Sequence, residues 1–154
     1  MTFSIQFVEQ GSWESWFAPG ELVLNDSIES FVASVDPGTE WTRRDYERQW
    51  RTGLKRITDG ETKSCLITSL PDPGQTDFLQ FWPMYRVRDW VVLQEKWMLP
   101  TGLPPGFDPA RPYQIVEDWI SISDTGQKIS EWWVPYRDVV DFRPQSLRDN
   151  QPKK

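Results

Sequence analysis

The N-terminal part of the chain alternates apolar and polar positions with a period of two, the pattern of half-buried β-strands. Three strands are predicted on this pattern, at residues 3–8, 21–24 and 28–35. Asn25 and Asp26 suit a tight turn between the last two strands, because both residue types tolerate turn conformations. Pro19-Gly20 indicates another turn, just before the second strand.

Residues 42–58 change to the period of an α-helix. Apolar side chains recur at i, i+4, i+8 and i+11, namely Tyr46, Trp50, Leu54 and Ile57. Thr42 and Asp45 resemble a capping box at the start of the helix, and Gly60 suits a glycine cap after its end. Gly53 lies inside the helix, where glycine costs about 1 kcal/mol relative to alanine. The opposite face is basic and consists of Arg44, Arg48, Arg51 and Lys55.

The C-terminal half returns to strand-like patterns. Five strands are predicted, at residues 65–70, 78–87, 90–99, 119–122 and 129–134. Pro83 marks a sheet edge or a bulge because proline cannot donate a ladder hydrogen bond. Residues 88–89 and 124–127 are predicted turns, and residues 100–112, with five prolines, form a long surface loop. Residues 136–142 can form one short helical turn.

Together these patterns predict an α+β fold. We expect a single domain over residues 1–142, in which a mostly antiparallel sheet packs against one main helix at about residues 42–58. The full length of 154 residues suits one domain. Residues 143–154 are polar and contain proline, so they are expected to form a flexible tail.

The composition excludes several classes of chemistry. The chain has no histidine and one cysteine, which removes histidine-based catalysis, zinc sites built on histidine or cysteine, and disulfides. Cys65 lies in an apolar run and is expected to pack as a small hydrophobic side chain. Neither a dinucleotide-binding nor a phosphate-binding glycine motif is present. We therefore expect no cofactor and no metal.

The charge is distributed unevenly along the chain. The net charge is −6, and residues 1–40 contain seven acids without a single lysine or arginine, whereas residues 41–63 are basic. One explanation is that the basic helix packs beside the acidic strands and neutralises them within the fold. The other is that the acidic stretch attracts a basic partner, which electrostatic complementarity would steer. An acidic chain argues against direct binding of nucleic acid.

The ten tryptophans are the main candidates for partner contact. Trp50 is on the apolar helix face and is expected in the core, whereas Trp132 and Trp133 point to opposite faces of a strand, so that one can be exposed. The aromatic residues leave two other classes of function possible, a binding module and a hydrolase. Exposed tryptophans can bind sugars or peptides, and Glu131, flanked by aromatic residues, could act as the acid or base of a carboxylate-only hydrolase, although pairing with an arginine is the simpler interpretation.

Five stretches, taken in order, resemble a family of bacterial contact-dependent growth inhibition immunity proteins over residues 40–142. They are Asp45-Tyr46-Glu47-Arg48-Gln49-Trp50, Lys63-Ser64-Cys65-Leu66-Ile67-Thr68-Ser69, Asp72-Pro73, Trp82-Pro83-Met84-Tyr85-Arg86 and Ile129-Ser130-Glu131-Trp132-Trp133-Val134-Pro135. The resemblance implies a non-enzymatic cytoplasmic inhibitor that binds the C-terminal toxin domain of a surface-delivered effector. Such toxins are often nucleases, whose basic surfaces hold phosphate. The resemblance also implies scaffold roles for Asp45, Tyr46, Trp50, Trp82, Pro83 and Trp133.

The expected partner is thus a basic toxin domain, with neither nucleic acid nor membrane as a direct partner. No stretch reaches the roughly 18 apolar residues of a membrane span, and residues 1–6 do not resemble a secretion signal. The base-free N-terminal segment is the expected toxin-binding surface. Its candidate residues are an apolar anchor, Trp13 or Trp16, and the acids Glu14, Glu21, Asp26 and Glu29.

Overall fold

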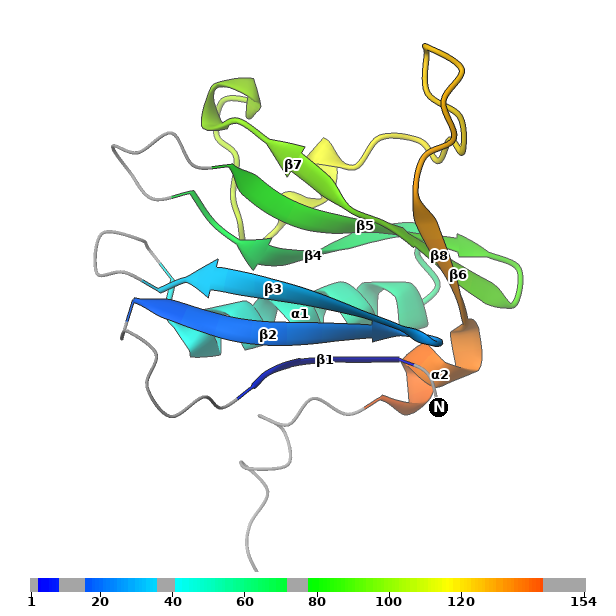
Figure 1. Ribbon diagram of the computed structural model, residues 1–154, viewed down its shortest axis with the longest axis horizontal. Helices are drawn as coiled ribbons and strands as arrows, with labels where there is room; N and C mark the ends of the chain where they lie inside the picture. Colours follow the sequence, from blue (N-terminus) through cyan, green and yellow to red (C-terminus); the bar gives the residue numbers. More distant parts are fainter. Residues whose placement is uncertain (1–2, 9–15, 36–40, 72–77, 143–154) are drawn as a thin grey trace, which may run out of the picture.

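The computed structural model describes residues 3–8, 16–35, 41–71 and 78–142. These residues form two antiparallel sheets and one long helix around a continuous hydrophobic core, as Figure 1 shows, which confirms the predicted α+β class. The predicted tail at residues 143–154 lies outside the described residues.

The first sheet consists of β1 (Phe3–Phe7), β2 (Phe17–Leu24) and β3 (Ser27–Ser34), in that spatial order. The turn predicted at Pro19-Gly20 is wrong, because both residues lie inside β2, opposite Val32 and Phe31. A Cβ atom on Gly20 would lie only 2.2 Å from Cζ of Phe31. The Phe31 ring therefore covers the bare backbone at Gly20, and this packing places a turn-forming residue in a strand.

The β2–β3 hairpin ends in the turn predicted at Asn25 and Asp26. Asn25 has a φ of 59°, in the left-handed region that asparagine enters more readily than most residues. The eight residue pairs that follow run from Leu24 opposite Ser27 to Phe17 opposite Ser34. The hairpin is consequently regular along its whole length, with alternate side chains on opposite faces.

The second sheet has the order β4 (Lys63–Ser69), β5 (Leu79–Val87), β6 (Trp90–Gln94) and β8 (Glu131–Pro135), and β7 (Lys96–Met98) also pairs with β5. The single strand predicted over residues 90–99 is wrong, since Glu95 divides it into β6 and β7. Pro83 lies between the residues of β5 that pair with β7 and those that pair with β6. The proline that cannot donate a ladder hydrogen bond thus sits opposite the break.

The strand predicted at residues 119–122 is also wrong, apart from one isolated bridge between Ile122 and Lys128. Side chains of the second sheet occupy the backbone carbonyls that a neighbouring strand would need. Tyr85 Oη donates to the carbonyl of Glu117 at 2.9 Å, and Gln94 Nε2 donates to the carbonyl of Ile120 at 2.9 Å. The segment is therefore held against the sheet by side chains.

The remaining short elements fall near their predicted places. The proline-rich loop contains the 3-10 helices η1 (Pro100–Gly102) and η2 (Pro112–Ile115). The C-terminal helical turn is α2 (Tyr136–Asp141), which follows β8 directly. Among the described residues no helix is both long and apolar enough to cross a membrane.

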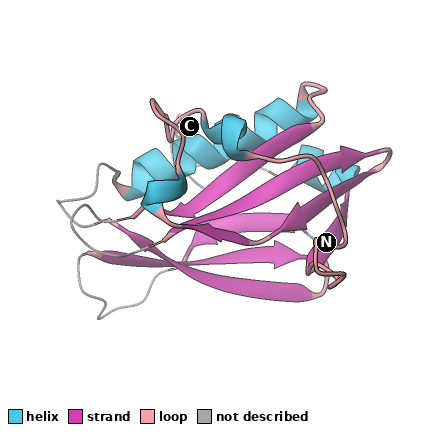
Figure 2. Cartoon of the chain, turned by 90° about the horizontal axis from the view of Figure 1, so that it is seen from above, coloured by secondary structure: helices cyan, strands magenta, loops and turns pink. Residues whose placement is uncertain are grey.

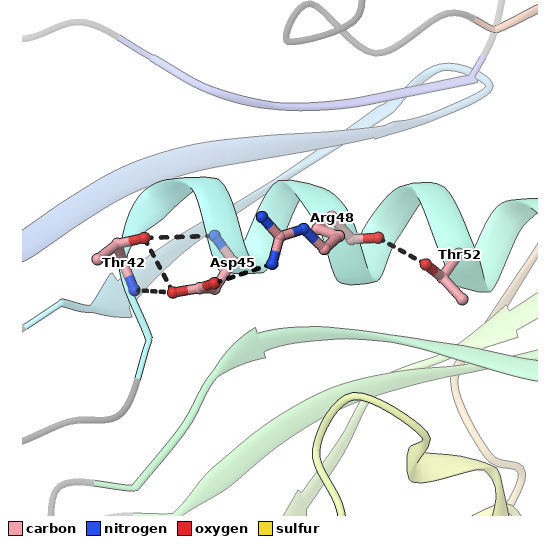
Figure 3. Close-up of polar contacts among 4 residues, drawn as sticks. All are labelled: Thr42, Asp45, Arg48 and Thr52. Carbon is pink, nitrogen blue, oxygen red and sulfur yellow. Dashed lines mark hydrogen bonds and ion pairs between the residues drawn. The ribbon is translucent and has the colours of Figure 1, made fainter.

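The long helix α1 (Arg43–Thr58) begins and ends where the sequence predicts. Figure 3 shows its capping box, in which the Thr42 side chain accepts a hydrogen bond from the Asp45 amide and Asp45 Oδ2 accepts one from the Thr42 amide at 2.9 Å. Asp59 is the C-terminal cap, and Gly60 follows with a φ of 105°. Local signals alone fix both helix ends, which is why they could be read from the sequence.

Side chains of α1 cover the free edge of β4. Gln49 Nε2 donates to the carbonyl of Cys65 at 2.9 Å, and its Oε1 accepts from the Ile67 amide at 2.7 Å. Trp50 Nε1 donates to the carbonyl of Ile67 at 2.7 Å. A Cβ atom on Gly53 would lie 2.5 Å from the Cys65 carbonyl oxygen, so glycine is needed for this close approach. The helix thus replaces a missing strand at this edge.

The same helix also supports the first sheet. The ring centroids of Phe7 and Phe31 lie 4.8 and 5.7 Å from that of Trp50, and Tyr46 Oη donates to the Ser34 carbonyl at 2.7 Å. Figure 2 shows the long helix along one side of the strands. Because α1 contacts both sheets, it fixes their positions relative to each other.

Candidate interaction surface

The structure places four of the six predicted partner-binding residues, since Trp13 and Glu14 lie outside the described residues. Trp16 is 50% exposed at the start of β2. Glu21 is half-buried in β2, Asp26 is exposed in the hairpin turn, and Glu29 is half-buried in β3.

The register of the hairpin separates the two strand acids. Glu21 is opposite Ser30, whereas Glu29 is opposite Leu22, which is fully buried. Directly opposed residues share a face, so Glu29 lies on the core side of the sheet and Glu21 on the outer side. Glu29 accepts a hydrogen bond from Ser27 Oγ at 2.7 Å. The structure therefore does not bring the predicted acids together into one patch.

The outer face of the hairpin is more apolar than the sequence suggested. Exposed apolar side chains surround Glu21 on this face, namely Phe17, Ile28 and Val32, with Ile28 61% exposed. They face solvent because the alternation in β2 and β3 turns Leu22, Leu24 and Phe31 inward. A face with exposed apolar residues and one acid has the mixed character of a protein interface.

The basic helix does not neutralise the acids of the hairpin. Arg48 pairs with Asp45, Lys55 with Asp59 and Arg56 with Glu61, all within residues 45–61. Across the described part of the chain, Glu21, Asp26 and Glu29 form no ion pair. For these three acids, the described part of the chain thus gives no support for neutralisation by the basic helix.

A second surface, which the sequence did not predict, gathers three partly exposed tryptophans at the edge strand β8. Trp90, Trp119 and Trp133 are 42%, 36% and 37% exposed. Trp133 packs edge to face with both others, with ring centroids 6.3 Å from Trp90 and 5.7 Å from Trp119. We call these three residues the aromatic cluster. Trp133 is therefore not a purely internal scaffold residue, whereas its neighbour Trp132 packs against the buried Trp82.

Glu131 connects two members of the aromatic cluster, Trp119 and Trp133. Its carboxylate accepts hydrogen bonds from Trp133 Nε1 at 2.9 Å, Trp119 Nε1 at 3.2 Å and Gln94 Nε2 at 3.0 Å. Ser121 Oγ lies 3.3 Å from the same carboxylate. Burial raises the pKa of Glu131, but these hydrogen bonds together outweigh burial and hold the pKa below its ordinary value.

This geometry argues against Glu131 as a catalytic acid. A general acid needs a raised pKa, and the carboxylate here is stabilised in its ionised form. The expected pairing with arginine is not present either, since within the described residues its side-chain partners are neutral donors. Among those residues there is also no group of three acids or cysteines that could hold a metal ion.

The hairpin turn contacts β8 beside the aromatic cluster. Asn25 Nδ2 donates a hydrogen bond to the carbonyl of Trp133, across 108 residues of sequence. In Figure 1 the tip of the β2–β3 hairpin accordingly lies beside β8. Asp26, in the same turn, is thus brought near β8, the strand that carries Trp133.

The thiol of Cys65 is buried and unreactive, as its apolar neighbours in the sequence predicted. Burial raises the pKa of its thiol from 9.0 to about 12, and burial also raises the pKa of Tyr85 from 10.0 to about 12. Both groups lose their protons at lower pH in the unfolded chain than in the folded one. The folded chain therefore holds more protons above pH 9, and the stability present below that pH is lost as the pH rises toward 12.

We expect the free energy of unfolding to fall between pH 9 and pH 11, measured as the urea midpoint at several pH values. Burial also raises the pKa of Tyr46 and Tyr113, so a Cys65→Ala variant removes one of several such groups and should show a shallower fall. Identical pH slopes for the two proteins would contradict the assignment to Cys65.

Comparison with known proteins gives consistent matches. A family model described as the CdiI N-terminal domain matches residues 37–142. A protein of Enterobacter cloacae subsp. cloacae named Immunity protein CdiI is 28% identical over 124 residues, which are 80% of this chain and 83% of that protein. A chain of the solved CdiA-CT/CdiI toxin and immunity complex from Enterobacter cloacae has a TM-score of 0.79 and 27% identity, covering 96% of this chain and 99% of that chain.

Proposed function

This chain belongs to the family of the CdiI N-terminal domain, and from that premise we propose that it is an immunity protein, which binds a cognate toxin domain and neutralises it. The observation that carries the proposal is the likeness, over nearly the whole chain, to a chain solved within a toxin and immunity complex. The toxin is the C-terminal domain of a contact-dependent growth inhibition effector. The chain acts in the cytoplasm.

On this proposal the chain inhibits the toxin by binding to it, and it needs no catalytic reaction of its own. The carboxylate that the sequence offered as a catalytic group is committed to holding two indole rings. The buried thiol of Cys65 is held protonated at neutral pH. Glu131 therefore lacks the proton of a general acid and Cys65 lacks the charge of a thiolate nucleophile, in agreement with a protein that works by binding.

The toxin is proposed to be a nuclease with a basic surface. A nuclease must hold phosphate with lysine or arginine, and an acidic inhibitor can compete for that surface. The net charge of −6 supports this partner, as do two acids without an ion pair among the described residues, the half-buried Glu21 on the outer face and the exposed Asp26 in the turn. Trp16, which precedes β2 at the end of the hairpin away from the turn, would supply a separate exposed apolar contact, and Glu29, on the core side of β3, contributes only at long range.

The direct test uses the toxin domain encoded by the neighbouring effector gene. Cells that express this domain should survive when they also express the chain, and the two proteins should copurify. Unchanged killing in the presence of the chain would overturn the proposal.

Charge reversal tests the acidic surface within the same experiment. A Glu21→Lys, Asp26→Lys double variant should associate with the toxin at least tenfold more slowly at low salt, because steering depends on complementary charge. A matched control is Asp108→Lys, an exposed acid in the loop between η1 and η2. Stopped-flow association across a salt series gives the measurement, and equal on-rates for all three proteins would remove the hairpin from the interface.

A further inference from the structure

We propose that the aromatic cluster of Trp90, Trp119 and Trp133, joined by Glu131, is the centre of the toxin interface and receives an arginine or lysine side chain of the toxin. This inference rests on the proposed function. It adds the location of the main contact and the chemistry of the group that fills it.

The first argument is the fixed orientation of the rings. Trp119 belongs to the segment of residues 117–120, which side chains hold against the second sheet, and Trp133 belongs to β8. Both indole N–H groups nevertheless donate to the carboxylate of Glu131. The edge-to-face contacts of Trp133 with its two neighbours add to this restraint. Rings that are already held in place lose little conformational entropy on binding, so more of the contact energy appears as affinity.

The second argument is the exposure of rings that the fold has not buried. More than a third of each indole faces solvent, whereas Trp50 and Trp82 are almost fully buried in the core. Tryptophan and arginine are the residues most enriched among binding hot spots. A cluster of fixed, partly exposed tryptophans is therefore better explained by a partner than by stability.

The third argument is the charge of the Glu131 carboxylate at the edges of two rings. The donors to Glu131 are indole, amide and hydroxyl groups, which satisfy the carboxylate without cancelling its charge. The exposed acids in the segments around the cluster and in the hairpin turn are Asp26, Asp89, Glu117 and Asp124, and the exposed bases are Arg88, Lys128 and Arg137, with Arg86 half-buried. Asp118 pairs with Lys63.

The negative charge of Glu131, which is hydrogen-bonded to two of the rings, selects the occupant. A cation over an indole face gains about 0.5–2 kcal/mol, with tryptophan the best aromatic partner. A carboxylate hydrogen-bonded at the edges of the rings strengthens that attraction, whereas it would repel an acidic segment. The cluster is consequently matched to a basic side chain, which a toxin that holds phosphate must display.

The fourth argument is continuity with the hairpin. The hydrogen bond from Asn25 to the Trp133 carbonyl fixes the hairpin turn, which contains Asp26, against the strand that carries Trp133. Ile120 and Ile122 are also exposed in the segment that carries Trp119. Apolar residues beside a polar rim and aromatic anchors are the usual anatomy of a protein interface.

The test compares tryptophan variants on two sheet edges. Trp119→Ala with Trp133→Ala should weaken binding to the purified toxin domain by about 30-fold or more, the size expected for a hot spot. The matched control is Trp97→Ala, because Trp97 is 56% exposed on β7 and packs edge to face with Phe78. Calorimetry gives the affinities, and near-ultraviolet circular dichroism reports whether each variant is folded.

Glu131→Gln tests the charge separately from the rings. The amide keeps an acceptor for an indole N–H but loses the negative charge, so both the affinity and its dependence on salt should fall. If the double tryptophan variant loses its fold, Trp119→Ala alone replaces it, since Trp119 lies outside both sheets.

The outcomes separate this inference from the proposed function. A wild-type chain that fails to bind the toxin would overturn the function. A wild-type chain that binds, with tryptophan variants that bind equally well, would overturn the aromatic cluster and leave the function standing. Loss of binding in Trp97→Ala alone would place the interface on β7, and an unchanged salt dependence in Glu131→Gln would exclude a cationic occupant.

Discussion

Replacing Trp50 with alanine is expected to lower the free energy of unfolding by about 3–5 kcal/mol, the usual cost of removing a buried tryptophan side chain. Trp50 is 1% exposed, and its indole contacts the rings of Phe7 and Phe31. The substitution leaves a cavity between the helix and the first sheet. It also leaves the Ile67 carbonyl without its indole donor.

Urea unfolding followed by circular dichroism measures this loss. Trp97→Ala is again the matched control, because it removes the same side chain from the surface and should change stability by no more than about 0.5 kcal/mol. Similar losses in both variants would mean that Trp50 does not join the helix to the sheets as the structure shows.

Replacing Gln49 with leucine is expected to cost at least about 2 kcal/mol, even though leucine is as good a helix former as glutamine. Gln49 is 3% exposed, and its amide satisfies both the Cys65 carbonyl and the Ile67 amide at the edge of β4. Leucine fills the same space without either hydrogen bond. Two buried backbone groups would then lack partners, and each unsatisfied group costs about 1–3 kcal/mol.

Hydrogen exchange gives a local measurement in addition to the urea midpoint. The amide of Ile67 should exchange faster in Gln49→Leu, since its acceptor is gone. Gln114→Leu, at an exposed position in η2, is the control for the change of residue type. Undiminished protection of the Ile67 amide would show that the helix does not cover this edge.

Both substitutions lie away from the proposed interface, so their effect on stability can be separated from any effect on toxin binding. Variants that remain folded should retain their affinity for the toxin, because the hairpin and the aromatic cluster keep their own contacts. Protection of cells should fall only as far as the folded fraction falls. In contrast, the tryptophan variants at β8 should lose protection while remaining folded.

The predicted toxin-binding residues show what a charge pattern in the sequence can and cannot predict. The base-free stretch of residues 1–40 drew attention to the hairpin, and the structure leaves the charges of Glu21 and Asp26 without an internal partner among the described residues. The same pattern could not show that Glu29 turns toward the core side. That depends on strand register, which sets the face of every side chain in a strand.

The aromatic cluster is a feature that the local sequence predicted only in small part. The alternation around Trp132 and Trp133 predicted that one of the two would be exposed, and it is Trp133. Nothing in the local sequence indicated that Trp90 and Trp119 would meet it. Residues 90, 119 and 133 come together for two reasons. Strand β6 pairs with β8, and side chains of Tyr85 and Gln94 hold the segment of residues 117–120 against the second sheet.

The sequence by itself determined the features that depend on neighbouring residues: the period and both ends of α1, the turn at Asn25 and Asp26, the α+β class and the resemblance to a family. Capping, turn formation and periodicity act over a few residues, so they can be read locally. Only the tertiary structure decided the strand through Pro19-Gly20, the break at Glu95, the need for Gly53 and the position of the aromatic cluster. Each of these depends on a contact between distant segments, and such contacts override local preference when they bury apolar surface or satisfy backbone groups.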